Sequence, residues 1–166
     1  MICAMLWTGT TFSQYLASFT LKNLPGDFYM NLYASTISEG IAIVLSGIFA
    51  STYNFKATLI CGYILAFLAG AFVTANPTDS EMLFAFFVLL SRFGVCITFN
   101  MNYIAVQRLF PSAVLSSVFG VTNLFARFLT VLAPLVAEQP GSKPMGIFTG
   151  IMVLCGGVAT MLDTRV

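Results

Sequence analysis

Histidine is absent from this 166-residue sequence, and charged side chains are scarce. Without histidine, the common zinc ligand sets and histidine-based acid–base catalysis are excluded. Seven basic and six acidic residues make up 8% of the chain, against about 25% in soluble domains. Hydrophobic residues make up 58% instead. This composition predicts an integral membrane protein.

Cysteine is also sparse and unpaired in spacing. Its four copies fall one each in four different apolar segments, and they are Cys3, Cys61, Cys96 and Cys155. Such isolated cysteines are typical of small apolar helix residues, and they predict neither a disulfide framework nor a metal site. The chain also lacks a phosphate-binding glycine loop. We therefore expect no cofactor, no metal, no nucleic-acid partner and no enzymatic activity.

Long apolar runs, separated by short polar loops, are what the sequence has instead. A crossing of the hydrocarbon core takes about 20 residues, and the backbone in lipid must be helical to satisfy its own hydrogen bonds. The runs predict an all-α membrane protein with a single bundle over residues 1–166 and six transmembrane helices. The predicted spans cover about 1–21, 28–50, 58–75, 82–107, 115–137 and 144–162.

The basic residues of the loops predict the orientation of the bundle. With both chain ends in the cytoplasm, that side holds Lys56, Arg108 and Arg165, against Lys22 and Lys143 outside. The excess of basic residues inside favours this orientation by a small margin. The plasma membrane is the membrane we expect. Met1 leads directly into apolar residues, from which we expect a truncated beginning.

Three ionisable residues fall near the centres of predicted spans: Glu39, Arg92 and Arg127. Each opposes insertion by about 2.5–3.5 kcal/mol if unpaired, so such residues usually face a protein interior or a watery cavity. Glu39 can neutralise one arginine in a structural pair. The other arginine is then left to bind an anionic ligand or an acid from another segment.

Polar and aromatic residues recur at helical spacing beside these charges. One stripe contains Ser116, Gly120, Asn123, Arg127, Thr130 and Pro134; a second contains Trp7, Thr11, Gln14 and Ser18; a third contains Arg92, Cys96, Phe99 and Tyr103. The spacing places each stripe on one helix face, which predicts three faces around a common interior. For Trp7 and Tyr103 the alternative is ordinary packing, and for Asn123 it is an interhelical hydrogen bond.

Four stretches carry a resemblance to a known family. They are Leu6–Trp7, Gly26–Gly40, Ser91–Ser112 and Phe119–Val136. In order and spacing they resemble the C-terminal six-helix half of the organic ion transporters of the major facilitator superfamily. The resemblance implies one half of that fold, built from two inverted three-helix repeats, and it implies that a six-helix N-terminal half exists outside this chain.

The resemblance also implies a function and a set of site residues. It implies that this half moves a small organic ion, with an anion or zwitterion favoured, by alternating access. Arg127 matches a position where members handling organic anions or zwitterions commonly carry arginine. The substrate-binding residues that we predict are Arg127, Glu39, Arg92, Asn123, Trp7, Gln14 and Tyr103.

The sequence departs from the family pattern at its cytoplasmic loops. The basic glycine-containing signature after the second helix is reduced to Lys56, and Arg108 and Leu115 stand where an acidic and a basic residue are usual. An alternative hypothesis follows from these departures: a truncated or transport-inactive membrane protein that acts as an interaction or regulatory subunit. A six-helix channel subunit has less support, because no pore-loop or charge-ring pattern occurs.

Overall fold

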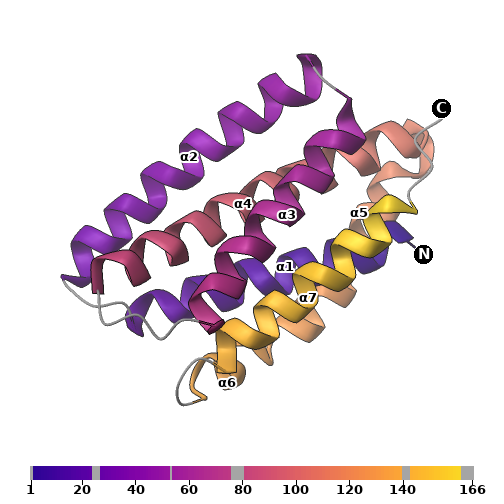
Figure 1. Ribbon diagram of the computed structural model, residues 1–166. Helices are drawn as coiled ribbons and strands as arrows, with labels where there is room; N and C mark the ends of the chain where they lie inside the picture. The colour runs from indigo at the N-terminus through magenta and orange to yellow at the C-terminus, as the bar shows by residue number, and fades with distance from the viewer. Residues whose placement is uncertain (1, 24–26, 53, 76–80, 140–142, 162–166) are drawn as a thin grey trace.

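The computed structural model is built from helices that run side by side in one bundle (Figure 1). It describes residues 2–23, 27–52, 54–75, 81–139 and 143–161. Arg165, with its predicted cytoplasmic side, lies outside the described residues. The long helices are α1 (Ile2–Thr20), α2 (Phe28–Thr52), α3 (Phe55–Ala75), α4 (Glu81–Leu109), α5 (Ser112–Thr130) and α7 (Lys143–Thr160). Two short helices, η1 (Leu21–Asn23) and α6 (Ala133–Ala137), follow α1 and α5.

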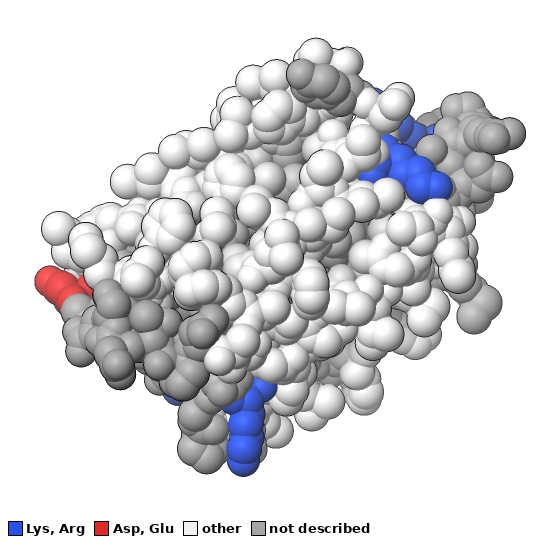
Figure 2. Space-filling model, viewed as in Figure 1, with Lys and Arg blue, Asp and Glu red and all other residues white. Residues whose placement is uncertain are grey.

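Five of these segments are long and apolar enough to cross a membrane, judged over the described parts of the chain. They are Phe28–Thr52, Phe55–Ala75, Met82–Leu109, Ser112–Ala137 and Lys143–Thr160. On the face seen in Figure 2, charged side chains lie toward the two ends of the molecule and the middle is uncharged. An uncharged face of this kind is what contact with the hydrocarbon core requires. The all-α membrane fold is confirmed.

Helix α1 is more polar than the other long helices, and for this reason it is not among the five candidate membrane spans. It contains Thr8, Thr10, Thr11, Ser13 and Gln14 in its central turns. Its neighbours α4, α5 and α7 surround it, so most of these polar groups face protein. The start of α1 and the end of α7 lie at the same end of the bundle (Figure 1), which requires an even number of passes. This geometry favours α1 as a sixth crossing.

The fifth crossing is interrupted where α5 passes into α6. Pro134 has no backbone N–H to donate to the preceding turn, so a regular helix cannot continue through it. The chain tightens there, and the amide of Leu132 donates to the carbonyl of Leu129 at 3.0 Å. The break comes after Arg127, so the side chain of this arginine projects from the last turn of regular helix.

The core lies where α3 packs against α4 and α7, and where α1 packs against α4, α5 and α7. Glycines permit the closest of these approaches, since a Cβ added at Gly94 would lie 2.7 Å from the backbone nitrogen of Ala66. Helix α2 instead packs mainly on α4 and keeps much of its apolar surface exposed. It forms an outer edge of the bundle (Figure 1).

Candidate functional site

The three mid-span charges are arranged around the C-terminal half of α1. Glu39 comes from α2, Arg92 from α4 and Arg127 from α5. Both arginines reach α1, because Arg92 donates from Nη1 to the carbonyl oxygen of Ala17 at 3.3 Å and Arg127 donates to the hydroxyl of Tyr15. Residues 15 and 17 point to roughly opposite sides of a helix with about 3.6 residues per turn.

Glu39 forms its ion pair with Arg92. The Nη2 group of Arg92 donates to Oε1 of Glu39, and the two side chains are 7% and 26% exposed, in that order. The Nε of Arg92 is buried and has no partner among the described residues. The ion pair thus offsets most of the free-energy cost of placing Arg92 within the membrane, although its Nε remains an unsatisfied donor. Glu39 keeps one side open to the surroundings.

Arg127 is exposed and has no acidic partner in the described part of the chain. Its contacts are with Tyr15 of α1, whose hydroxyl accepts its hydrogen bond and whose ring centroid lies 5.3 Å from its Cζ atom. An arginine held over an aromatic face keeps part of its planar fork free. This guanidinium remains able to bind a carboxylate or similar anion.

The polar stripe of α5 lies beside the face that packs on α1 and shares Thr130 with it; the rest of the stripe is half-buried or exposed. The packed face of α5 is made of Thr122, Ala126 and Thr130, which are small enough to let α1 approach. Asn123 is half-buried, and its Nδ2 donates within its own helix to the carbonyl of Phe119 at 2.9 Å. Among the described residues, the hydrogen bond that Asn123 donates thus stays within its own helix.

Trp7 and Tyr103 meet in an aromatic cluster shared by α1, α4 and α5. Their ring centroids are 4.3 Å apart, and Phe99 and Phe119 complete the cluster. Trp7 is 2% exposed, and its Nε1 is buried without a partner among the described residues. Eight residues of α1 separate Trp7 from Tyr15, a rise of about 12 Å along the axis. The cluster and Arg127 therefore occupy different depths.

Gln14 belongs to α1 and lies on the face of this helix between the residues that contact Arg92 and Arg127. In a helix, residues 14 and 18 occupy the face between residues 15 and 17. Gln14 is half-buried with a buried Oε1 that lacks a partner among the described residues, and Ser18 is exposed. The structure thus brings Arg127, Gln14, Arg92 and Glu39 to one region of the bundle, whereas Trp7 and Tyr103 lie deeper toward the opposite end.

Sequence reasoning missed a buried polar node inside the bundle. Thr10 of α1 and Tyr63 of α3 share a hydrogen bond of 2.8 Å, and Nδ2 of Asn102 from α4 donates to Thr10 at 2.9 Å. It also missed Tyr15, the partner of Arg127. Tyr63 and Asn102 are single polar residues in apolar helices, whereas Thr10 and Tyr15 belong to the polar helix α1; this polarity is the available signal. Helical spacing within one segment does not indicate which residues of three segments meet.

Several known proteins resemble this chain in sequence. No protein-family model matches the chain. Solute carrier family 22 member 4 of Mus musculus is 26% identical over 80% of the chain, which corresponds to 24% of that protein. Organic cation/carnitine transporter 2 of Homo sapiens is 26% identical over 78% of the chain and 23% of that protein.

A plant relative extends the same match. Organic cation/carnitine transporter 4 of Arabidopsis thaliana is 25% identical over 89% of the chain and 28% of that protein. The chain thus spans about a quarter of the length of these relatives. The relatives are transporters rather than enzymes, and the chain has the helices of an integral multi-pass membrane protein. The resemblance of this chain to the organic ion transporters of the major facilitator superfamily is confirmed.

Proposed function

We propose that this chain forms the C-terminal six-helix half of a secondary carrier for a small organic ion, with an anion or zwitterion favoured. An N-terminal six-helix half would complete the carrier, and the plasma membrane is the proposed location. Rocking of one half against the other would open a site near the middle of the bilayer to each side in turn. The transporter relatives support organic ion transport as the general activity.

One observation carries the preference for a substrate with a negative group. Arg127 lies within the fifth membrane-spanning segment, yet its described contacts are with one tyrosine and no acid. An unpaired cation costs about 2.5–3.5 kcal/mol in the membrane centre, so it calls for an anion or for water. Arg92 lacks this freedom, because Glu39 already neutralises it.

The proposed roles of the other predicted residues follow from their positions relative to Arg127. The substrate carboxylate would bind the free edge of the Arg127 guanidinium. A positively charged substrate group would find the exposed side of Glu39, so the Glu39–Arg92 pair would tune or gate the site. Gln14 and Asn123 would line the wall beside Arg127, and Trp7 and Tyr103 would form a more distant wall.

A transport-inactive interaction or regulatory subunit is the alternative, and it is not favoured. The relatives just described are named as transporters or solute carriers. The unpaired Arg127 has an evident use in binding an ion, whereas the regulatory alternative assigns it no role.

Uptake measurements on the full protein that contains this chain test the proposal. Carnitine, which carries a carboxylate and a quaternary ammonium group, is compared with tetraethylammonium, which lacks the carboxylate. Arg127→Ala should lower carnitine uptake by about tenfold or more, because a charge-assisted bidentate contact of roughly 1.5–3 kcal/mol is lost. Tetraethylammonium uptake should change far less. Arg127→Lys should retain part of the carnitine uptake, because it keeps the charge but loses the fork.

Leu132→Ala is the control, since Leu132 lies on an exposed apolar face of the same segment. It should leave uptake of both compounds near the level of the unmodified protein at equal surface expression. Carnitine uptake that is equal in Arg127→Ala and Leu132→Ala would remove Arg127 from the site.

A further inference from the structure

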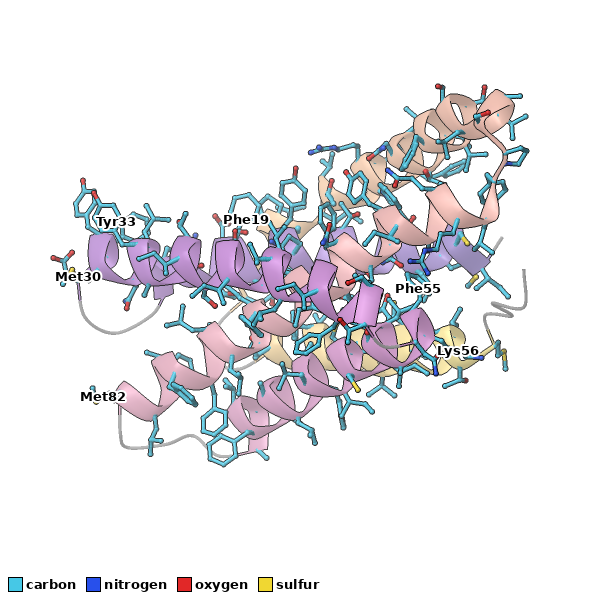
Figure 3. All side chains as sticks on the ribbon, turned by 90° about the horizontal axis from the view of Figure 1, so that it is seen from above. Phe19, Met30, Tyr33, Phe55, Lys56 and Met82 are labelled. Carbon is cyan, nitrogen blue, oxygen red and sulfur yellow. The ribbon has the colours of Figure 1, made fainter. Side chains whose placement is uncertain are left out.

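A cavity lies at the end of the bundle where α3 begins and α4 ends. It has a volume of about 560 Å³, and its lining includes Asn54, Phe55, Lys56, Ile60, Arg108 and Leu109. Figure 3 places Phe55 and Lys56 at the end of the molecule opposite to Met30, Tyr33 and Met82. Helix α5 begins just after α4 ends, and Arg127 lies in its last turn, so the cavity is remote from Arg127 and from the function proposed above.

Two cations from different helices face this one cavity. Lys56 belongs to the first turn of α3 and Arg108 to the last turn of α4. The Cζ atom of Arg108 lies 5.4 Å from the ring centroid of Phe55, which holds the guanidinium beside the cavity. None of the described lining residues is acidic, and neither cation forms an ion pair within the described chain. Two like charges at one cavity are stabilised by an anion placed between them.

The apolar lining suits the edge of a lipid bilayer. Phe55, Ile60 and Leu109 contribute hydrocarbon surface beside the two cations. The turns before α3 and after α4 follow the second and fourth passes of the bundle, so they meet at the same membrane surface. Basic residues at such a surface attract anionic lipid head groups by about 1 kcal/mol each. The positive-inside assignment places this surface in the cytoplasm, where anionic lipids are concentrated.

We infer that this cavity binds an anionic phospholipid, with its phosphate between Lys56 and Arg108 and its acyl chains against Phe55, Ile60 and Leu109. The backbone amides at the start of α3 add partial positive charge on the same side. Charge complementarity and the position at the membrane surface both favour a lipid over a soluble phosphate. Occupancy of this site would depend on how much anionic phospholipid the surrounding leaflet contains.

Lipid enrichment measures this binding. The full chain is reconstituted in vesicles of phosphatidylcholine with phosphatidylglycerol, then extracted gently in detergent, and the lipids retained per protein are quantified by mass spectrometry. The unmodified chain should retain phosphatidylglycerol above its share in the vesicles. The double variant Lys56→Gln with Arg108→Gln should lower that enrichment about tenfold or more, because each cation contributes about fivefold.

A matched control removes two cations from the other end of the bundle. Lys22→Gln with Lys143→Gln makes the same change in net charge and should keep the enrichment. Arg108→Lys should also keep most of it, because the charge remains, and helical circular dichroism checks that each variant is folded. Equal enrichment in the Lys56/Arg108 double variant and the unmodified chain overturns the proposal.

A second arm separates the lipid from a soluble anion. Inorganic phosphate is titrated into the extracted chain, and retained phosphatidylglycerol is measured again. Retention that persists at millimolar phosphate supports a lipid site. Displacement of the lipid by millimolar phosphate with no preference of the chain for phosphatidylglycerol over phosphatidylcholine overturns it in favour of a small-anion site.

Discussion

Glu39 and Arg92 show at the scale of single residues how a membrane helix can carry charge. Arg92 is almost fully buried, and its neutralisation depends on one carboxylate from a neighbouring helix. The carbonyl of Ala17 accepts a further hydrogen bond from Arg92, but Nε stays without a partner among the described residues. A pair of this kind is costly to break, because removal of one partner leaves an uncompensated charge.

Glu39→Gln should therefore destabilise the bundle by about 3 kcal/mol, the low end of the range for buried pairs because Glu39 is partly exposed. The substitution keeps the shape of the side chain and removes its charge. Thermal or denaturant unfolding in detergent micelles, followed by circular dichroism, measures the change in the free energy of unfolding.

Glu138→Gln is the control for this prediction. It breaks an exposed pair in which Lys22 and Glu138 are 3.8 Å apart, so it should cost less than about 1 kcal/mol. Similar losses in the two variants would contradict the structural importance of the Glu39–Arg92 pair.

At the scale of elements, the contact of α3 with α4 depends on glycine. A Cβ at Gly94 would lie 2.7 Å from the backbone nitrogen and 3.0 Å from the Cα of Ala66. The atoms that it would meet belong to a helix backbone, which cannot turn aside as a flexible side chain can. A Cβ added at Gly62 on α3 would lie 2.8 Å from Cγ2 of Thr98 on α4. The two helices thus approach each other through glycines.

Gly94→Ala should thus lower the free energy of unfolding by about 1–3 kcal/mol, the usual cost of overpacking. Gly47→Ala in α2 is the matched control, because nothing lies within 4 Å of its added Cβ. That change should stabilise the helix by about 0.5–1 kcal/mol, since alanine loses less conformational entropy than glycine. The same unfolding assay compares both variants. A neutral Gly94→Ala would show that the helices can separate freely.

At the scale of the whole molecule, exposed surfaces differ in chemistry. Helix α2 and the outer face of α5 present apolar side chains such as Ile37 and Leu124. On α5 the polar residues Asn123 and Arg127 are half-buried and exposed, in that order. A protein surface in a membrane cannot leave a guanidinium against acyl chains at low cost. If the proposed N-terminal half exists, we expect a watery chamber beside the polar stripe of α5, closed on its far side by that half.

Adjacent cysteine substitutions in the full protein test for this chamber. Asn123→Cys and Leu124→Cys lie at the same depth, but Asn123 belongs to the polar stripe and Leu124 is 71% exposed on the apolar face. A charged, water-soluble thiol reagent should label the cysteine at position 123 many times faster, because thiolates form in water and not in lipid. The labelling of the full protein without either substitution, which includes Cys3, Cys61, Cys96 and Cys155 of this chain, is subtracted as background. Equal, slow labelling at both positions would contradict the chamber.

The sequence by itself determined the class of the molecule. Apolar runs of about 20 residues can be satisfied only as membrane-crossing helices, so the all-α membrane fold follows from local composition. The sequence also singled out Glu39, Arg92 and Arg127 as candidate site residues, because a charge within a membrane-crossing helix is costly. The sequence also shows that α1 is polar, but it does not show that α1 is buried among α4, α5, α6 and α7, because that burial is a property of the assembled bundle.

Which charges pair was decided by the tertiary structure. The bounds of the apolar runs placed Glu39, Arg92 and Arg127 near the centres of three predicted helices, and either arginine could have been the partner of Glu39. The packing of α2 against α4 brings Glu39 to Arg92, and the packing of α5 against α1 leaves Arg127 with Tyr15. The Thr10–Tyr63–Asn102 node and the meeting of Lys56 with Arg108 have the same origin. Periodicity defines the face of one helix, whereas contacts between helices depend on how faces far apart in the chain are packed together.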